Sequence, residues 1–371
     1  MRISKLLIIW VLIIAVCSSA FAQSTDAAEP AEIFSAPKQI TISFAGDCTL
    51  GCTPLSRDHD PKNFEARITE NGLSYPFEKV RHIFENDDLT VVNLEGTFYD
   101  YDANRANKTY TFRSPTSFVD ILTLGDIEAV SIGNNHALDY GRPGQEATIA
   151  ALESRDIGWF GNNEYAAKTF VYEKDGIKIG FVAANISYWW SKGAVDKIKA
   201  SFAELEEAGC NITIACIHGG VEYDVRHDTN QEKMANAFIR YGADLVIGHH
   251  PHTIQGIRIE NGISTFWSLG NFSFGGNTQI RTMRTFIAQI TFSFDEENNY
   301  LGHQTNLIPC HVSGTEEYND FQPHPVTGKD ADDVIKAIQV DVKSTEKIYR
   351  KLKPYVEGVG AIQEFVPAGG K

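Results

Sequence analysis

Four short polar motifs contain the residues of this sequence whose types and spacing could do chemistry. They are Gly46-Asp47, Gly133-Asn134-Asn135-His136, His218-Gly219-Gly220 and Gly248-His249-His250-Pro251-His252. Aspartate, asparagine and histidine together form a ligand set that favours Mn, Zn or Fe over calcium or a thiolate-bound metal. The motifs therefore predict a transition-metal site.

Each motif follows an apolar run with the character of a β-strand. These runs cover residues 40–45, 129–132, 212–217 and 243–247. In an open α/β sheet, ligands bind just beyond the carboxyl ends of the strands. Side chains that follow different strands can therefore converge there although they lie far apart in the sequence.

Strand-like and helix-like segments alternate from about Gln39 onward. We expect strands at 40–45, 89–92, 128–132, 177–184, 211–217, 243–247, 263–269, 285–294 and 304–309. We expect helices at 76–86, 116–124, 143–155, 194–208 and 229–241, and a long amphipathic C-terminal helix at 329–354. This alternation predicts an α/β fold with βα units in the first two thirds. The strands from 263 to 309 follow one another without a helix, which predicts a meander forming much of a second sheet.

Three histidines in five residues after a buried strand are hard to place in a core, so the last motif predicts a functional loop. His249 and His252 would point towards metal, and His250 towards solvent or substrate. Glu95, which follows the run 89–92, offers a carboxylate in the same crevice. Asp47 and Asp139 each have a structural alternative, since carboxylates at such places also cap helices or brace loops.

The beginning of the sequence is typical of a secretory signal peptide. Arg2 and Lys5 precede an uncharged run, Leu6 to Ala22, which ends in an A-x-A-like sequence. This pattern predicts cleavage after Ala22 and a site of action outside the cytoplasm. The alternative is an uncleaved membrane anchor, because the run of about 17 residues could span a bilayer. Residues 23–38 read as a flexible linker.

Composition excludes several classes of function. The chain has 371 residues, of which 43% are hydrophobic, so it can bury a sizeable core. Its formal net charge is −15, and removal of the first 22 residues, which carry two cations and no anions, takes it to −17. Such a surface repels nucleic acid and anionic membranes. A polyanionic substrate would need local metal ions or arginines.

Five cysteines remain after cleavage, at positions 48, 52, 210, 216 and 310. An odd number at these spacings does not indicate a disulfide scaffold. Cys48 and Cys52 invite a metal or redox interpretation, but their spacing is not C-x-x-C. We expect small buried or loop thiols instead.

In order along the chain, the motifs resemble the CapA family of capsule-synthesis proteins. The resemblance rests on Phe44-Ala45-Gly46-Asp47, Asn93-Leu94-Glu95-Gly96, Phe112-Arg113-Ser114-Pro115, Gly133-Asn134-Asn135-His136-Ala137-Leu138-Asp139-Tyr140-Gly141, His218-Gly219-Gly220-Val221-Glu222-Tyr223, Gly248-His249-His250-Pro251-His252 and Gly270-Asn271-Phe272. It covers about residues 39–325, and residues 134–141 are its most specific part. It implies a four-layer αββα, metallophosphatase-like sandwich of two mixed sheets flanked by helices. Residues 326–371 would form a C-terminal helical extension.

The resemblance also implies roles for individual residues. Glu95 would bridge two metal positions, and His136 would be the neighbouring acid or substrate clamp, assigned together with Asp139 to catalysis. The other implied metal ligands are Asp47, Asn135, His218, His249 and His252. The implied substrate contacts are Arg113, Arg142, Glu222, Tyr223, His250 and Asn271, and for the two arginines the alternative is simple surface charge.

One position departs from the pattern of metallophosphatases. These enzymes place a histidine two residues after the first aspartate, where this sequence has Thr49. One metal position would thus lack an imidazole ligand, so the site would bind one ion firmly and a second weakly. The expected cofactors are one or two divalent ions of Mn, Fe or Zn, and no organic group.

The resemblance implies an extracytoplasmic, CapA-like protein that acts in the synthesis, tethering, export or release of poly-γ-glutamate or a related capsule polymer. Its partners would be an anionic polymer and membrane-bound capsule synthesis machinery, and not nucleic acid. One alternative is a secreted metal-dependent phosphoesterase that uses a metal-activated hydroxide. A second is a non-catalytic polymer-binding or export component. Whether the protein is an enzyme stays open at this point.

Overall fold

The first of two mixed β-sheets is built around β1 (Lys38–Thr49), which is buried along most of its length. The computed structural model describes residues 36–341, 356 and 358–369. β1 pairs in parallel with β2 (Leu89–Leu94) and antiparallel with β15 (Arg284–Phe294). At its C-terminal end, β1 pairs instead with β14 (Asn271–Phe274), in parallel. The predicted strand at 40–45 is thus the middle of a longer central strand.

The first sheet extends in both directions from this centre. Beyond β2 lie β5 (Ala129–Ser131) and β6 (Gly158–Asn162), both in parallel. Beyond β15 lies β16 (Tyr300–His311), antiparallel, and three short strands pair with β16, namely β17 (His324–Pro325), β18 (Ala361–Ile362) and β19 (Val366–Pro367).

The second sheet has a parallel centre with antiparallel strands at both sides. Its strands in spatial order are β8 (Phe170–Lys174), β9 (Ile177–Asn185), β10 (Ile212–His218), β11 (Leu245–His249), β13 (Ile263–Phe266) and β12 (Ile257–Glu260). β6 pairs with β9 as well as with β5, and β7 (Ala167–Lys168) pairs with β6. β6 thereby joins the two sheets into one hydrogen-bonded system. A separate two-stranded sheet joins β3 (Thr97–Phe98) to β4 (Arg113–Ser114).

The two sheets pack face to face around the main hydrophobic core. Ile42 of the first sheet and Phe181 of the second belong to this core. The neighbouring Val182 points the other way and belongs to a different core cluster, under helices. This alternation is expected, because successive side chains of a strand face opposite sides of the sheet.

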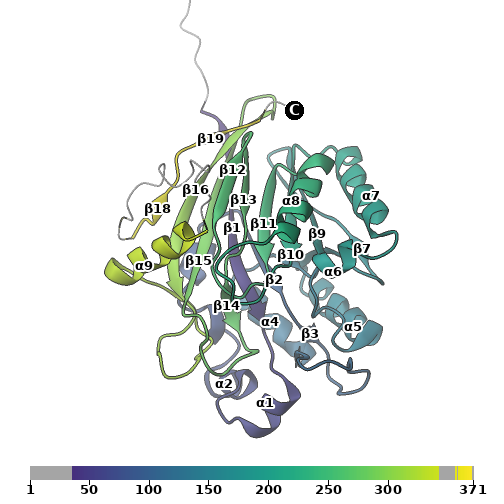
Figure 1. Ribbon diagram of the computed structural model, residues 1–371, viewed down its shortest axis with the longest axis vertical. Coiled ribbons are helices and arrows are strands. Elements are labelled where there is room, and N and C mark those ends of the chain that lie inside the picture. The colour runs from purple at the N-terminus through teal and green to yellow at the C-terminus, as the bar shows by residue number, and fades with distance from the viewer. Residues whose placement is uncertain (1–35, 342–355, 357, 370–371) are drawn as a thin grey trace, which may run out of the picture. The chain divides into compact units, whose positions relative to one another are not determined.

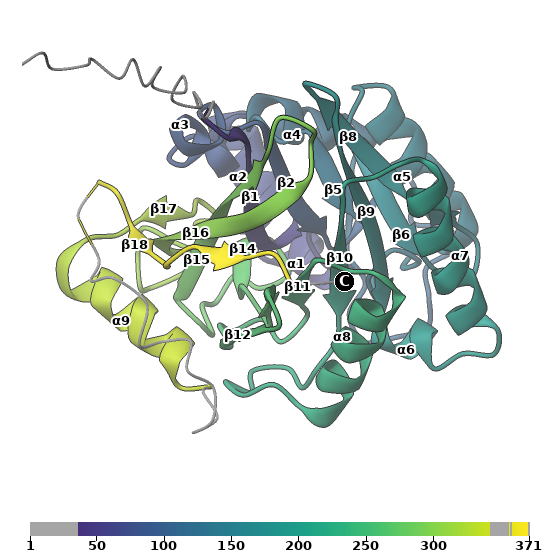
Figure 2. The same ribbon diagram turned by 90° about the horizontal axis from the view of Figure 1, so that it is seen from above.

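Helices cover the two outer faces, which completes the four-layer αββα sandwich expected from the sequence (Figures 1 and 2). Against the first sheet pack α2 (Phe64–Asn71), α3 (Arg81–Phe84), α4 (Asp120–Leu124) and α5 (Gly141–Glu153). Against the second sheet pack α6 (Ile186–Trp189), α7 (Ala194–Glu207) and α8 (Thr229–Tyr241). α1 (Pro54–His59) has no buried residues.

The predicted helix at 229–241 coincides with α8 because capping residues in the sequence specify both of its ends. Asp228 caps the first turn and forms a capping box with Gln231. Gly242 ends the helix in the left-handed conformation, at φ 118°. The predicted helix at 76–86, in contrast, is broken into a 3₁₀ turn at Tyr75–Phe77 and the single turn of α3.

The strands between 263 and 309 do not form the single meander that was predicted. β13 belongs to the second sheet, whereas β14, β15 and β16 extend the first sheet beside β1. The hydrophobic pattern could not reveal this, because a strand buried on both faces reads the same in either sheet.

At the C-terminal side, α9 (Gly328–Gln339) packs against β15 and β16 and adds Val334 and Ile338 to the core between the sheets (Figure 1). It covers the first half of the helix predicted at 329–354, and residues 342–355 lie outside the described residues. The predicted signal segment and most of the predicted linker also lie outside them. No helix within 36–341 or 356–369 has the length and apolar character of a membrane span.

The cysteines at positions 48, 52, 210, 216 and 310 are all free thiols, as predicted. Burial raises the pKa of the Cys52 thiol to about 12, and the nearby Glu65 carboxylate acts in the same direction. Neither Cys48 nor Cys52 is therefore a reactive thiolate.

His303 of β16 links the two sheets through the core. Its Nε2 lies 2.7 Å from the Ser264 hydroxyl of β13, and its Nδ1 lies 2.6 Å from the Tyr300 hydroxyl. The residue is completely buried, and this burial lowers the pKa of its imidazole to about 4. The folded protein therefore holds His303 neutral.

This buried imidazole predicts a loss of stability in mild acid. In the unfolded chain this histidine takes up a proton below its ordinary pKa of about 6.5, whereas in the folded chain it does so only near pH 4. The free energy of unfolding therefore falls as the pH is lowered, by about 2 kcal/mol near pH 5. His303→Gln keeps hydrogen-bonding capacity and removes the titration. Urea unfolding at neutral pH and near pH 5 should show a smaller pH difference for the variant. An equal difference in both proteins would contradict this assignment.

Candidate metal centre

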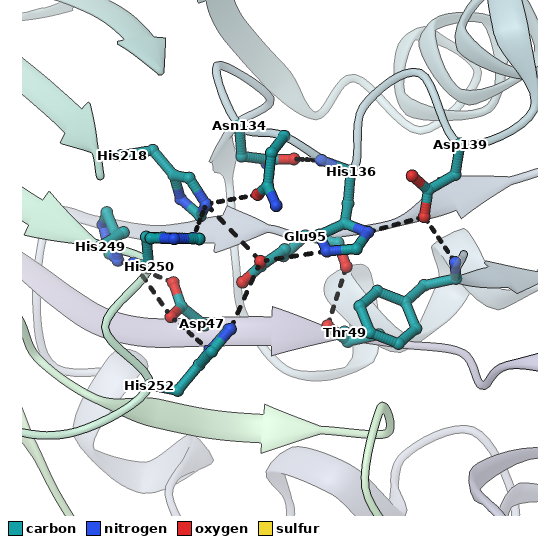
Figure 3. Close-up of polar contacts among 12 residues, drawn as sticks. Asp47, Thr49, Glu95, Asn134, His136, Asp139, His218, His249, His250 and His252 are labelled. Atoms are coloured by element: carbon teal, nitrogen blue, oxygen red, sulfur yellow. Dashed lines mark hydrogen bonds and ion pairs between the residues drawn. The ribbon is translucent and has the colours of Figure 1, made fainter. Parts of the chain in front are cut away.

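Strand register brings the predicted motifs together at one edge of the sandwich. Asp47 lies opposite Asn93 of β2 and opposite Asn271 of β14. In the second sheet, His218 at the end of β10 lies opposite His249 at the end of β11. The carboxyl ends of both sheets thus contribute to one cluster, as predicted (Figure 3).

Glu95 lies at the middle of this cluster and is completely buried. Its Oε1 lies 3.6 Å from His218 Nε2, 3.8 Å from His136 Nε2 and 3.9 Å from His252 Nε2 (Figure 3). No residue within the described ranges donates a hydrogen bond to either of its carboxylate oxygens. A buried carboxylate without hydrogen bonds is costly unless a cation compensates it.

Two groups of three residues could each hold a cation, and both include Glu95. One group is Asp47, Glu95 and His252, and the other is Glu95, His218 and His250. Within each group, the ligand atoms all lie within 4.8 Å of one another. Glu95 is therefore the residue that the two groups share.

Asp47 is completely buried between two imidazoles of the histidine loop. Its Oδ1 lies 3.3 Å from His249 Nδ1, and its Oδ2 lies 3.2 Å from His252 Nδ1. His249 Nδ1 is buried without a hydrogen bond. His250, predicted as a substrate contact, is instead one of the residues placed to hold a cation, whereas His249, predicted as a ligand, belongs to neither group of three.

Two asparagines behind the cluster orient its ligands. The Asn93 amide donates to Asp47 Oδ1 at 2.9 Å and lies 3.3 Å from His218 Nδ1. Asn134 donates in turn to Asn93 Oδ1 at 3.0 Å and to the Leu94 carbonyl at 2.8 Å. Such outer contacts fix the orientation of metal ligands.

The histidine loop has an unusual backbone that other segments hold in place. His250 and His252 have φ values of 99° and 56°, in the left-handed region that non-glycine residues rarely adopt. The Tyr223 amide donates to the Pro251 carbonyl, and the Thr282 hydroxyl donates to the His252 carbonyl, both at 2.7 Å. Gly248 is required before the loop, because a Cβ there would lie 2.1 Å from the Trp267 carbonyl oxygen.

The electrostatics of the cluster show an excess of negative charge. Burial and the Asp47 charge raise the pKa of Glu95 well above its usual value. Burial alone would lower the pKa of His252, but the Glu95 charge and the Asp47 hydrogen bond raise it to about 9. Both pKa directions reflect the negative charge that Asp47 and Glu95 bring to one buried place.

A divalent cation would compensate the negative charges of Asp47 and Glu95. The buried Glu95 carboxylate, which has no hydrogen bond within the described residues, and the mixed carboxylate and imidazole donors around it fit such an ion. Asn135, a predicted ligand, brings its Oδ1 to 2.7 Å from His218 Nε2 and thus stands beside the second group. The residues present therefore fit one or two transition-metal ions.

His136 and Asp139 form a hydrogen-bonded pair at the side of the cluster. His136 Nδ1 lies 2.7 Å from Asp139 Oδ2, and its Nε2 faces Glu95. Asp139 is completely buried, accepts a hydrogen bond from the Phe112 amide and forms an ion pair with Lys108. Burial lowers the pKa of His136, and the neighbouring Asp139 opposes that effect.

The two arginines predicted as anion contacts form ion pairs with carboxylates of the protein itself. Arg113 is largely buried, and its guanidinium pairs with Asp102 at 3.2 Å and donates to the Tyr99 carbonyl at 2.9 Å. Arg142 is exposed on α5 and pairs with Glu146 at 2.7 Å. Arg142 thus fits the alternative of simple surface charge, whereas Arg113 has a structural role that was not predicted from the sequence.

The remaining predicted residues lie at or beside the cluster. Asn271 Oδ1 is 2.9 Å from His252 Nδ1, and the Tyr223 ring lies 5.9 Å from the His252 ring. Glu222 is exposed, and its charge contributes to the raised pKa of His252 after the charges of Glu95 and Asp47. Thr49 is buried and donates to the Glu95 carbonyl at 2.8 Å, so it is no ligand.

Three residues of the centre were not assigned from the sequence. Asn93 had a signal, because it lies two residues before Glu95 and a strand places such residues on the same face. Asn134 lies in the motif Gly133-Asn134-Asn135-His136, but no role was assigned to it. Lys108 lies in an irregular loop, and no local pattern predicts that its ammonium reaches Asp139.

Comparisons with known proteins agree with the resemblance. The family model described as bacterial capsule synthesis protein PGA_cap matches residues 41–276. A "Capsule biosynthesis protein CapA" from Bacillus anthracis is 24% identical over 277 residues, covering 69% of this chain and 65% of that protein. A "PGA biosynthesis protein CapA" from Bacillus subtilis is 27% identical over 251 residues, covering 63% of each chain. The matched region thus spans less than two thirds of either relative.

Among solved structures, a putative 5′-nucleotidase from Staphylococcus aureus, in complex with alpha-ketoglutarate, has a TM-score of 0.43 and 12% identity. That match covers 89% of this chain and 70% of the other.

Proposed function

Because the chain belongs to the bacterial capsule synthesis protein PGA_cap family, we propose that it is an extracytoplasmic protein whose metal centre acts on a poly-γ-glutamate-like capsule polymer during its synthesis, tethering, export or release. The observation that carries this proposal is Glu95, whose two buried oxygens have no hydrogen bond and which belongs to both groups of metal-binding residues. A buried carboxylate arranged in this way binds cations.

The metal centre supports a chemical role as well as a binding role. Ions held by Asp47, Glu95, His218, His250 and His252 would supply Lewis-acid stabilisation of negative charge on a substrate oxygen. The protein itself orients these ligands through Asn93 and Asn134.

His136 supplies a proton-transfer group beside the metal centre. Asp139 accepts the hydrogen bond of Nδ1–H, which fixes the tautomer in which Nε2 carries the free lone pair. Nε2 faces the cluster and takes up or returns a proton there. Lys108 forms an ion pair with the Asp139 carboxylate and so helps to hold it beside His136.

A second candidate function is phosphoester hydrolysis. Two groups of ligands that share a carboxylate are the arrangement found in two-metal phosphoesterases, where paired ions stabilise the attacking and leaving oxygens. Thr49 does not weaken this candidate, because His250 brings a further imidazole to the second group.

Metal content tests the proposed function. The purified chain, stripped with a chelator and reconstituted separately with Mn, Fe or Zn, is expected to retain about one to two ions per chain. His303→Gln, which changes a buried histidine outside the cluster, is the matched control and should retain the same number. Absence of bound metal before and after reconstitution would contradict the proposal.

The location is a separate part of the proposal. It rests on the signal-like pattern of Arg2, Lys5 and Leu6 to Ala22. Cell fractionation combined with N-terminal sequencing tests it. A chain that begins at Met1 in the cytoplasm would contradict it.

A further inference from the structure

A polar groove lies beside the metal centre, between α1 and the segment 276–281. Its volume is about 510 Å³, and residues that line it include Thr53, Ser56, His59, Asp60, Asn277 and Arg281. Two of these residues also contact Tyr223, whose ring lies against His252 of the metal centre. Tyr223 thus lies between two residues of the groove and His252 of the metal centre.

Arg281 is the free cation of this groove. Its guanidinium lies over the Tyr223 ring, 5.1 Å from the centroid, and within the part of the chain that the structure describes no carboxylate pairs with it. Arg113 and Arg142, in contrast, are paired with Asp102 and Glu146. Stacking on an aromatic ring holds the guanidinium plane in place and leaves its edge free for an oxyanion.

The other polar groups of the groove are mostly neutral. Thr53, Ser56 and Asn277, which carry neutral hydroxyl or amide groups, line the groove. The Asn277 amide makes a single long contact with the Tyr223 hydroxyl, at 3.5 Å, so most of its hydrogen-bonding capacity is unused there. Neutral donors and acceptors of this kind suit the amide groups of a polymer backbone.

The negative charges around the groove disfavour ligands that carry closely spaced negative charges. Asp60 lines the groove, Glu222 lies beside the metal centre, and the whole chain carries a formal net charge of −15. A polymer with a charge on every backbone unit, such as polyphosphate, would be repelled along this path. A polyamide with spaced carboxylates would place one of them on Arg281 and its amides on the neutral groups.

We propose that this groove binds a carboxylate-bearing polyamide chain that extends from the metal centre, and that Arg281 anchors one of its carboxylates. This inference rests on the proposed function, because the metal centre is where the bound chain would react. It assigns Arg281 the substrate-anchoring role that the sequence had suggested for Arg113 and Arg142.

The test compares Arg281→Gln with Arg142→Gln, which removes the same charge from an exposed arginine on α5. Binding of glutamate and of short and long γ-linked glutamate oligomers to the metal-loaded protein is measured by calorimetry at two salt concentrations. Loss of a charge-assisted hydrogen bond should weaken oligomer binding to Arg281→Gln about 10- to 100-fold. Arg142→Gln and the wild type should bind oligomers equally, and Arg281→Lys should restore part of the affinity.

Three further readouts decide the outcome. Single glutamate should bind wild type and Arg281→Gln alike, because it is too short to join the metal centre to Arg281. Oligomer binding that is equal in both arginine variants, or polyphosphate bound more tightly than glutamate oligomers, would overturn the proposal. The metal content of the same samples tests the metal centre separately. If metal is bound but the arginine variants bind oligomers equally, the groove proposal is wrong and the metal centre stands. If no metal is bound, the proposed function itself is wrong.

Discussion

Glu95→Gln is expected to reduce metal affinity by at least about 100-fold, because it removes a carboxylate ligand shared by both groups of metal-binding residues. The glutamine amide is nearly the same size, so packing is conserved. It is neutral, however, and its NH₂ group would face His218, His136 or His252. The variant should therefore retain little metal after reconstitution.

The same substitution should change which protein melts at the higher temperature: the variant or neither in chelator, and the wild type with metal. In chelator, Glu95→Gln should melt at the same temperature as the wild type or higher, since it no longer buries a carboxylate without partners. With metal at about 1,000 times its Kd, the wild type should gain about 4 kcal/mol, and the variant should gain far less. Melting curves with and without metal measure this crossing.

Glu222→Gln is the matched control for that experiment. Glu222 is exposed and belongs to neither metal-binding group. It should melt like the wild type with and without metal. If metal stabilises Glu95→Gln as much as it stabilises the wild type, Glu95 is not a ligand.

Asp139→Asn is expected to lower kcat by about 100- to 10,000-fold, the usual range for loss of a positioned acid or base. An asparagine can present its NH₂ group to His136 Nδ1, which would favour the opposite imidazole tautomer and remove the lone pair from Nε2. Metal content should be unchanged, because Asp139 belongs to neither metal-binding group. Turnover is measured with γ-linked glutamate oligomers and with a generic phosphodiester.

A double-mutant cycle separates this role from a purely structural one. If Asp139 acts through His136, then Asp139→Asn in a His136→Gln background should cause little further loss of kcat. If the two substitutions instead reduce kcat independently, so that their fold-losses multiply in the double variant, Asp139 does not act through His136. Lys108→Gln is the milder companion, since it removes the ion pair with Asp139 and leaves the His136 hydrogen bond.

Much of the fold could be predicted from local sequence. The strands and the helices α5, α7 and α8 follow from hydrophobic periodicity and from capping residues such as Asp228. The elements that were missed include β6, β8, β12, β14 and the short helices of residues 54–71. Their segments are short or lack a clear period, and their structure depends on packing against neighbours.

The metal centre was predictable in location and only partly in detail. The resemblance to the CapA family implied Asp47, Glu95, His218 and His252 as ligands, and the structure brings these four residues together. Which of His249 and His250 joins them could not be predicted, because both follow the same strand. The left-handed backbone at His250, φ 99°, decides that its ring meets His218.

By itself, the sequence determined the chemical types of the ligands, the strands that carry them and the family to which the chain belongs, since these depend on residue identity, spacing and period. Only the tertiary structure decided that β14 lies beside β1, that Arg113 and Arg142 pair with other carboxylates, and that Lys108 and Arg281 lie beside the centre. The physical reason is that strand periodicity specifies which face a residue occupies. Loop conformation and pairing between distant segments depend on contacts that exist only in the folded chain.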